Sequence, residues 1–275
     1  MKPDLHTHST ASDGVLAPEA LVRAAMAAGV TTVALTDHDT FDGVDRLENA
    51  PIPVIRGIEL SINDMHGLHL LGYGVTAAPE LRQRVAELAA KRRDRARRIT
   101  ERLAELGMPV DYDALLATCG GTVGRMHIAR AMVAAGYAAT PQEVFERWLG
   151  NDGPAYVAGE RLSMAEALPL MRRNGFVPVL AHPAELNKDD ITLRALVAAW
   201  QEQGLMGVEV YHPSQRGRGF AALDAMVRRM GLLVTGGSDF HAEGDKHGAL
   251  GCMADAWTRR EEDLAALTAA MGASR

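Results

Sequence analysis

Short apolar runs alternate with longer amphipathic stretches along most of the chain. The apolar runs span residues 32–35, 54–60, 68–73, 177–181, 207–211 and 231–235, and turn-forming residues bound them. Runs of this length and composition are typical of buried strands. Apolar residues at helical spacing over 18–28 and 191–203 predict helices, each followed by a glycine that suits a helix C-terminus. Alternating strands and helices indicate a parallel sheet or a barrel.

The alternation stops between residues 81 and 162, where the pattern is almost wholly helical. We therefore expect two parts: a barrel built from residues 1–80 and 163–275, and a small helical insertion, 81–162, that covers the barrel mouth as a substrate-binding cap. The predicted fold class is α/β, and 275 residues are enough to bury a full core.

Histidines and carboxylates follow the predicted strands near the points where the strands finish. They are His6, His8, Asp13, Asp37, His38, Asp39, Glu59, His69, His182, His212, Asp239 and His241. Because the carboxyl ends of barrel strands converge on one face, we expect these side chains to meet there. Imidazole and carboxylate ligands together suit zinc, manganese or iron, so the pattern predicts a multinuclear metal centre.

Each cluster also has a plain structural explanation when it is taken alone. Two histidines at a strand end can simply be solvated, TDHD (36–39) can be a turn with an aspartate helix cap, and GGSDFH (236–241) can be a glycine turn. Asp37 and Asp39 either orient histidine ring N–H groups or serve only the turn. The gathering of all the clusters at successive strand ends favours the metal centre over these alternatives.

Composition narrows the class of protein. Hydrophobic residues make up 47% and charged residues 23% of the chain, which is ordinary for a globular protein and leaves no case for disorder. No apolar run approaches the roughly 18 residues of a membrane span, and we expect no signal peptide. Cys119 and Cys252 lie too far apart in sequence to indicate a cysteine zinc site. We expect a cytoplasmic enzyme with neither a membrane nor an obligate protein partner.

The charge is unevenly distributed and indicates an anionic substrate. The net charge is −6, yet residues 81–130 carry eleven Lys or Arg against six Asp or Glu. Residues 91–98, KRRDRARR, are most simply a solvated basic face. Near an expected helix start, Arg125, His127 and Arg130 are candidate phosphate ligands, because helix N-termini and guanidinium groups both bind oxyanions. The alternative is a helix that only packs on the barrel.

The motifs HTHSTASDG, TDHD, GIEL, LHLLGY, AHP and GSDFH, in this order and over nearly the whole chain, resemble those of the polymerase and histidinol phosphatase (PHP) family of the amidohydrolase superfamily. The resemblance implies a distorted (β/α)7 TIM-like barrel, three divalent metal ions and hydrolysis of phosphate esters. More narrowly, the chain resembles bacterial 3′,5′-nucleotide bisphosphate phosphatases and 5′-to-3′ exoribonucleases, in which a small helical domain interrupts the barrel.

The resemblance also implies how the ligands divide among the ions. One ion would be surrounded by His6, His8, Glu59 and Asp239. Glu59 would bridge to a second ion held by His69 and His182, and the third would be held by Asp13, His38 and His241. The residues that act in the reaction would be His6, His8, Glu59, Asp239 and His241. Near them would lie the substrate contacts Arg125, His127, Arg130 and His212, although His212 is equally interpreted as a packed strand-end histidine.

These features favour a metal-dependent phosphomonoesterase that removes the 3′-phosphate from nucleoside 3′,5′-bisphosphates, such as 3′,5′-adenosine bisphosphate. The chain has no G-x-S-x-G elbow and no phosphate loop, so water is the expected nucleophile. The resemblance implies Mn2+ as the metal, with Zn2+ or Fe2+ as alternatives. The nearest alternative is a 5′-to-3′ exonuclease acting on short RNA oligonucleotides. An alternative of another class is a catalytically silent PHP module that acts through a protein partner.

Overall fold

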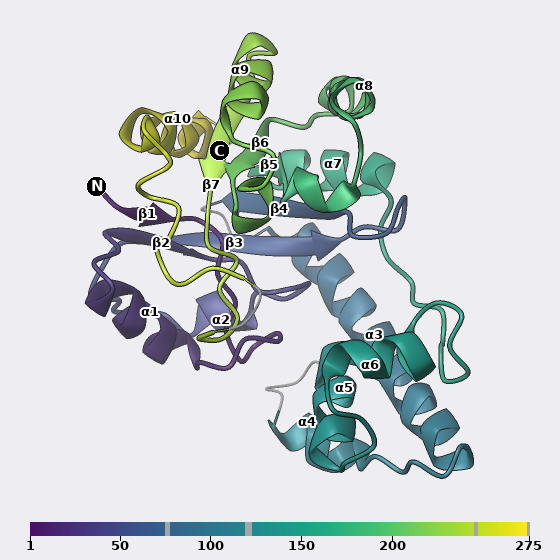
Figure 1. Cartoon of the computed structure of the whole chain (residues 1–275). Coiled ribbons are helices and arrows are strands. Elements are labelled where there is room, and N and C mark those ends of the chain that lie inside the picture. Colours follow the sequence, from purple (N-terminus) through teal and green to yellow (C-terminus); the bar gives the residue numbers. More distant parts are fainter. Residues whose placement is uncertain (75–77, 119–122, 245–246, 274–275) are drawn as a thin grey trace.

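A curved sheet lies at the centre of the molecule (Figure 1). The computed structural model describes residues 1–74, 78–118, 123–244 and 247–273. Within these ranges seven strands lie side by side in chain order: β1 (Pro3–Asp4), β2 (Thr32–Leu35), β3 (Val54–Ser61), β4 (His69–Gly74), β5 (Phe176–Leu180), β6 (Gly207–Tyr211) and β7 (Leu233–Gly236). Strands β2 to β7 match the predicted apolar runs to within two residues at either end.

The sheet closes into a barrel where β7 meets the segment that follows β1. The Leu5 amide donates a hydrogen bond of 3.1 Å to the Gly236 carbonyl, and Thr7 and Phe240 form a parallel bridge. Strands β2, β5 and β6 are buried at every position, as expected for barrel strands that helices cover. The prediction of a distorted TIM-like barrel is confirmed.

Strand β4 departs from the predicted arrangement. It pairs antiparallel with both β3 and β5, whereas the other described pairs are parallel. His69 therefore stands at the beginning of a strand, and the prediction that every polar cluster follows a strand end is wrong for this residue. It still reaches the mouth of the barrel, because it pairs with Ser61, the last residue of β3.

Helices cover the outside of the barrel. They are α1 (Pro18–Ala27), α2 (Asp42–Asp45), α7 (Met164–Arg173), α8 (Asp190–Glu202), α9 (Ala221–Arg229) and α10 (Arg260–Ala273), with the 3-10 turns η2 (Pro183–Leu186) and η3 (Pro213–Gln215). Helices α1 and α8 confirm those predicted over 18–28 and 191–203. Buried side chains such as Leu21, Val197 and Leu267 join the strands in one hydrophobic core. The described helices include none with the length and hydropathy that a bilayer crossing requires.

A group of helices projects to one side of the barrel (Figure 1). In the described part of this stretch they are α3 (Pro79–Glu105), α4 (Tyr112–Thr118), α5 (Arg125–Ala134), α6 (Pro141–Val144) and the π-helical turn η1 (Phe145–Leu149). They share a second hydrophobic cluster, in which Leu103, Ile128 and Val144 are fully buried. We call this part the cap; its limits at residues 81 and 162 stay a prediction.

Helix α3 belongs to both hydrophobic clusters. Leu81, Val85 and Leu88 lie in the barrel core, and Ile99 and Leu103 lie in the cap core. At 3.6 residues per turn these five side chains project within about 60° of one another around the helix axis. A single face of one helix, roughly 40 Å long at 1.5 Å per residue, therefore packs on the barrel at one end and inside the cap at the other.

Candidate metal centre and its cavity

Four buried side chains from three parts of the barrel meet at its mouth. His6 and His8 follow β1, Glu59 lies near the end of β3, and Asp239 follows β7. His6 Nε2 lies 3.3 Å from both Glu59 Oε2 and Asp239 Oδ1. His8 Nε2 lies 3.2 Å from each of the same two oxygens. The structure thus brings together the four residues predicted to surround the first ion.

The local backbone is built around these side chains. The Asp4 carboxylate accepts hydrogen bonds from the Ser238 amide and hydroxyl, at 2.8 and 2.7 Å, and so fixes the loop that carries Asp239. Asp239 has a φ of +53°, a left-handed conformation that costs a non-glycine residue about 1–2 kcal/mol. At Gly237 a Cβ would lie 2.4 Å from the Cβ of His6, so only glycine allows this close approach.

The spacing fits ligands arranged around one cation. Ligand atoms about 2.1 Å from an ion are separated from one another by about 3.0–3.4 Å. His6 Nε2, His8 Nε2, Glu59 Oε2 and Asp239 Oδ1 are buried and make no hydrogen bond within the described ranges. A buried polar atom without a partner costs about 1–3 kcal/mol. Four such atoms that converge at these distances are well explained by a divalent ion between them.

A second group forms on the other oxygen of Glu59. Glu59 Oε1 lies 3.0 Å from His69 Nδ1 and 3.0 Å from His182 Nε2, and the two imidazole nitrogens are 3.2 Å apart. His69 begins β4, and His182 follows β5. One carboxylate whose two oxygens face two separate groups can bridge two ions.

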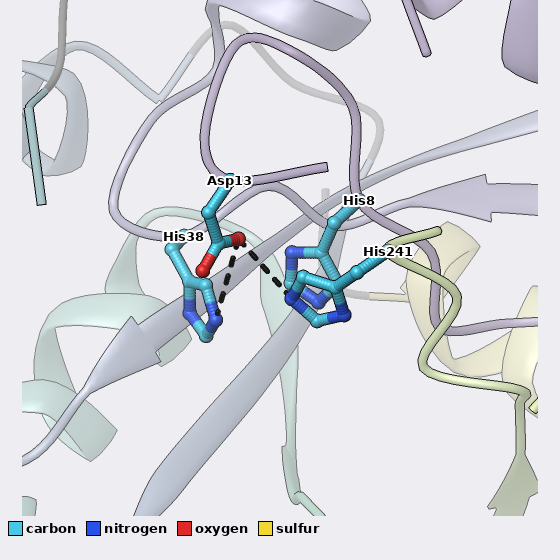
Figure 2. Close-up of side chains that lie close together, drawn as sticks. All are labelled: His8, Asp13, His38 and His241. Atoms are coloured by element: carbon cyan, nitrogen blue, oxygen red, sulfur yellow. Dashed lines mark ion pairs between the residues drawn. The ribbon is translucent and has the colours of Figure 1, made fainter. Parts of the chain in front are cut away.

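A third group surrounds the carboxylate of Asp13 (Figure 2). Asp13 Oδ1 lies 3.1 Å from His241 Nε2 and 4.0 Å from His38 Nε2. His8 also faces this group, and its ring stacks on His241 with centroids 4.1 Å apart. His38 directs its other nitrogen, Nδ1, to within 3.1 Å of Glu59 Oε2. The nine predicted ligands therefore converge, with His8 and His38 between groups, and their assignment to particular ions stays a prediction.

Imidazoles and carboxylates in the centre perturb one another strongly. Burial alone lowers the pKa of His8, but the carboxylates of Asp239 and Glu59 outweigh it and raise that pKa to about 10. Burial is likewise outweighed at His182, where Glu59 raises the pKa to about 9. For His38, burial dominates and lowers the pKa to about 3. The centre as a whole favours positive charge at the points where the carboxylates converge.

The two aspartates of TDHD hold neighbouring loops. Asp37 accepts hydrogen bonds from the Ser9 amide and the Ser12 hydroxyl, both at 2.7 Å. Asp39 accepts from the amide and the hydroxyl of Ser61, both at 2.9 Å. Asp37 therefore holds the loop after β1, and Asp39 holds the end of β3; these described hydrogen bonds go to serines and not to histidine rings.

Glu209 on β6 is a buried carboxylate of the centre that the sequence motifs did not identify. Its Oε1 lies 3.0 Å from His6 Nδ1, and its Oε2 accepts a hydrogen bond of 2.8 Å from the His182 amide. The contact at Nδ1 leaves Nε2 of His6 facing the first group, which is how carboxylates orient metal-binding imidazoles. Its signal in the sequence is a lone charge between Val208 and Val210, because a charge in a buried strand needs a partner.

A cavity of about 360 Å³ opens between the metal centre and the cap. Its barrel end includes the predicted ligands Asp13, His38 and His69. Its cap end combines an apolar wall of Ile99, Val123, Met126 and Phe145 with the cations Arg92, Arg95, Arg125 and Arg161. The cavity can therefore hold an anionic group and an apolar ring side by side, next to the metal centre.

The arginines of the cavity destabilise one another. Burial, with the neighbouring charge of Arg161, lowers the pKa of Arg92 to about 10. Burial and the charge of Arg125 lower the pKa of Arg95 to about 10. Arg92 forms an ion pair with Asp39 of the barrel. Clustered cations of this kind favour the binding of an oxyanion, which relieves their repulsion.

The interpretation of residues 91–98 as a solvated basic face is wrong for two of its members. Arg93 and Arg98 are exposed, but Arg92 and Arg95 turn into the cavity. The sequence carried a signal for this, because the apolar face of α3 passes through position 92 at helical spacing. An arginine on an otherwise buried face needs an anionic partner.

The predicted substrate contacts on α5 differ in where they point. The helix begins at Arg125, as predicted, and Arg125 and His127 line the cavity. Arg130 instead donates a hydrogen bond of 2.9 Å from Nη1 to the carbonyl of Asp13, and the described cavity lining does not include it. Arg125 donates to the Leu149 carbonyl at 3.0 Å.

Other sequence candidates lie around Asp239 or outside the described ranges. His212 is buried after β6, with Nε2 at 3.4 Å from Asp239 Oδ2, and it is not part of the described cavity lining. His247 Nδ1, from a residue that the sequence motifs did not identify, lies 2.8 Å from the same oxygen. Cys119 lies outside the described residues, and Cys252 is a free thiol.

Comparison with known proteins gives relatives of similar length. A 5′-3′ exoribonuclease of Haemophilus influenzae is 35% identical over 246 residues, which cover 87% of this chain and 90% of that protein. A 3′,5′-nucleoside bisphosphate phosphatase of Chromobacterium violaceum is 30% identical over 250 residues, which cover 88% of each chain.

Solved structures share the fold. An amidohydrolase from Chromobacterium violaceum, solved with bound sulfate and no metal, is 29% identical and superposes with a TM-score of 0.81 over 90% of each chain. A protein of Bifidobacterium adolescentis assigned to the metal-dependent phosphoesterases is 29% identical, with a TM-score of 0.83 over 98% of this chain and 96% of that chain. The sequence profile of the PHP domain matches residues 4–150. The chain belongs to the PHP domain family.

Proposed function

We propose that the protein is a metal-dependent phosphomonoesterase that removes the 3′-phosphate from nucleoside 3′,5′-bisphosphates, with water as the nucleophile. The observation that carries the proposal is the cavity, where four arginines lie beside a convergent group of imidazoles and carboxylates. One end of the cavity suits the phosphate that is cleaved, and the cationic end suits a second phosphate that is held. The relative named as a bisphosphate phosphatase supports this choice.

The cofactors in this proposal are three divalent ions, of which Mn2+ is the first choice and Zn2+ or Fe2+ the alternatives. The donor set consists of imidazole and carboxylate without thiolate, which suits all three metals. Such ions, when bound, lower the pKa of water and offset the negative charge that develops on a phosphoryl group. The protein contributes the orientation of the ligands, through the Glu209 contact with His6 and the Asp37 contacts with Ser9 and Ser12.

Arg125 is the residue that we assign to the uncleaved phosphate. Its guanidinium lies over the rings of Phe145 and Tyr156, at 5.5 and 5.9 Å from their centroids, and donates to the Leu149 carbonyl. These contacts restrict the side chain before substrate arrives, so less entropy is lost on binding. The apolar wall beside it, with Phe145, suits the nucleobase.

A 5′-to-3′ exonuclease acting on short RNA is the second candidate. Relatives at 33–35% identity carry the name 5′-3′ exoribonuclease. The same arginines would then hold the 5′-phosphate of an oligonucleotide. The two functions share the metal centre and differ in whether a phosphomonoester or a phosphodiester is cleaved.

A comparison of substrates tests the proposal. With Mn2+ present, we expect a nucleoside 3′,5′-bisphosphate to have a kcat/KM well above that of the 3′-monophosphate, because only the bisphosphate engages Arg125. Replacing Arg125 by Ala removes a charged hydrogen-bonding contact of about 1.5–3 kcal/mol, so kcat/KM for the bisphosphate falls by about 10- to 100-fold. The 3′-monophosphate is barely affected.

Arg98→Ala is the matched control, because Arg98 is exposed on α3 and its described ion pair is with Asp94, one turn away on the same helix. Preferential hydrolysis of a 5′-phosphorylated oligonucleotide would favour the exonuclease. Equal rates on bisphosphate and monophosphate, unchanged by Arg125→Ala, would contradict the assignment of Arg125. No turnover of any of these substrates would favour a catalytically silent module.

A further inference from the structure

Helix α5 of the cap forms hydrogen bonds with the backbone of the loop that carries Asp13. Arg130 Nη1 donates a hydrogen bond of 2.9 Å to the Asp13 carbonyl. His127 lies three residues earlier, on the same face of the helix, and forms a hydrogen bond with the backbone of the preceding loop residue, Ser12. Two consecutive residues of one barrel loop are therefore held by one face of a cap helix.

The geometry at His127 fixes which nitrogen donates. Its Nδ1 accepts a hydrogen bond of 3.1 Å from the Gly124 amide, at the start of α5. A neutral imidazole that accepts at Nδ1 carries its proton on Nε2. Nε2 is therefore the donor to the Ser12 carbonyl. The His127 side chain thus caps the start of α5 and also binds the loop that carries Asp13.

The loop is held from the barrel side as well. Asp37 accepts hydrogen bonds from the Ser9 amide and the Ser12 hydroxyl. The Asp13 carboxylate lies between these two sets of backbone contacts and faces the metal centre, with Oδ1 at 3.1 Å from His241 Nε2. The carbonyl of Asp13 thus binds the cap, and its carboxylate faces the metal centre.

We propose that Arg130 and His127 are positioning residues, through which the cap completes the third ion site by holding the Asp13 carboxylate in place. The inference rests on the metal centre of the proposed function, but it gives Arg130 a different role from substrate contact. A cap that moved away from the barrel would release the Asp13 loop on one side. Affinity for one ion, and not only affinity for substrate, then depends on the docking of the cap.

Metal binding without substrate tests this inference. Metal-free protein is titrated with Mn2+ by calorimetry, and circular dichroism checks the fold of each variant. Arg130→Met keeps an unbranched apolar stem but removes the guanidinium donors. We expect it to weaken one ion by about 10- to 100-fold, the range for loss of a residue that orients a ligand. Arg130→Lys, which keeps a donor, restores most of the affinity.

Arg147→Met is the matched control, because Arg147 is an exposed arginine of the cap, on η1, whose described ion pair is with Glu143; its Mn2+ affinities should equal those of the unmodified protein. Asp13→Asn identifies the ion concerned, and the double variant Asp13→Asn with Arg130→Met should be no weaker than Asp13→Asn alone. If Arg130→Met does not fold, His127→Phe removes the other contact and is expected to weaken the same ion.

Unchanged Mn2+ affinities in folded Arg130→Met, or in His127→Phe in its place, would overturn the inference and leave the metal centre intact. If Arg130→Met had unchanged Mn2+ affinities but a raised KM for the bisphosphate, Arg130 would be a substrate contact and not a positioning residue. If Asp13→Asn also bound Mn2+ as the unmodified protein does, Asp13 would not be a ligand, and both the third ion and this inference would fall.

Discussion

Glu209 offers a test at the scale of one residue. Its two oxygens serve different partners, His6 Nδ1 and the amide of His182. Glu209→Gln keeps the size of the side chain but replaces one acceptor by an NH2 donor, so one of the two contacts must be lost. We expect Mn2+ affinity at the ion held by His6 to fall by about 10- to 100-fold in calorimetry.

Glu202→Gln provides the control, because Glu202 is exposed at the end of α8 and should leave Mn2+ binding unchanged. A folded Glu209→Gln protein with unchanged affinity would show that Glu209 fills space without orienting His6.

Residue types and spacing predicted which side chains converge at the centre better than which residues support them. Most of the nine predicted ligands lie at a strand end or shortly after it, and such positions can be read from the sequence. The exceptions are His69, at a strand start, and Asp13, which the loop after β1 brings back to the centre. The contact between His6 and Glu209 joins residues 203 positions apart, and no local pattern encodes such a pair. The position of Arg92 in the cavity could have been predicted from the sequence, because Arg92 lies on the apolar face of α3.

At the scale of the element, the apolar runs predicted where strands lie but not how β4 runs. Strand direction depends on the connections at either end, and the hydrophobicity of a run is the same in both directions. The spacing of apolar residues also predicted that the cap is helical, because these residues repeat there at helical spacing. The role of α5 on the Asp13 loop depends on tertiary contacts and was not predictable.

Ile99 tests whether the cap has a stability of its own. The side chain is 1% exposed in the cap cluster, so Ile99→Ala should destabilise this cluster by about 2–5 kcal/mol. Hydrogen exchange in α5 should accelerate accordingly, while exchange in β5 and β6 stays slow. Leu106→Ala, at the exposed end of α3, is the control and should change stability by less than about 0.5 kcal/mol. Equal acceleration in barrel and cap would mean that they unfold as one unit.

At the scale of the whole molecule, metal loading should be coupled to protons. At pH 7 the metal-free protein holds a proton on His8, whose pKa is raised to about 10, and on His182, whose pKa is raised to about 9. Histidine ligands must be deprotonated to bind a metal ion. Loading therefore releases protons, and apparent affinity rises with pH until the pH passes these two values. His38, with a pKa of about 3, has no proton to release at pH 7.

Calorimetric titration with Mn2+ in buffers of different ionisation enthalpy measures this release, and elemental analysis of the loaded protein should approach three ions per chain. Binding heats that do not depend on the buffer would contradict the protonation of these two histidines. A reproducible value of one ion per chain would rule out the trinuclear centre.

The continuity of α3 constrains how the length of the chain can change during evolution. The barrel and the cap share one face of this helix, and Arg92 and Arg95 lie on it between Leu88 and Ile99. Inserting one residue there would rotate the whole cap by about 100° and carry its arginines away from the mouth. Inserting seven would restore the orientation to within about 20° and lift the cap by about 10 Å. Relatives with longer substrates should therefore differ in this helix by whole turns.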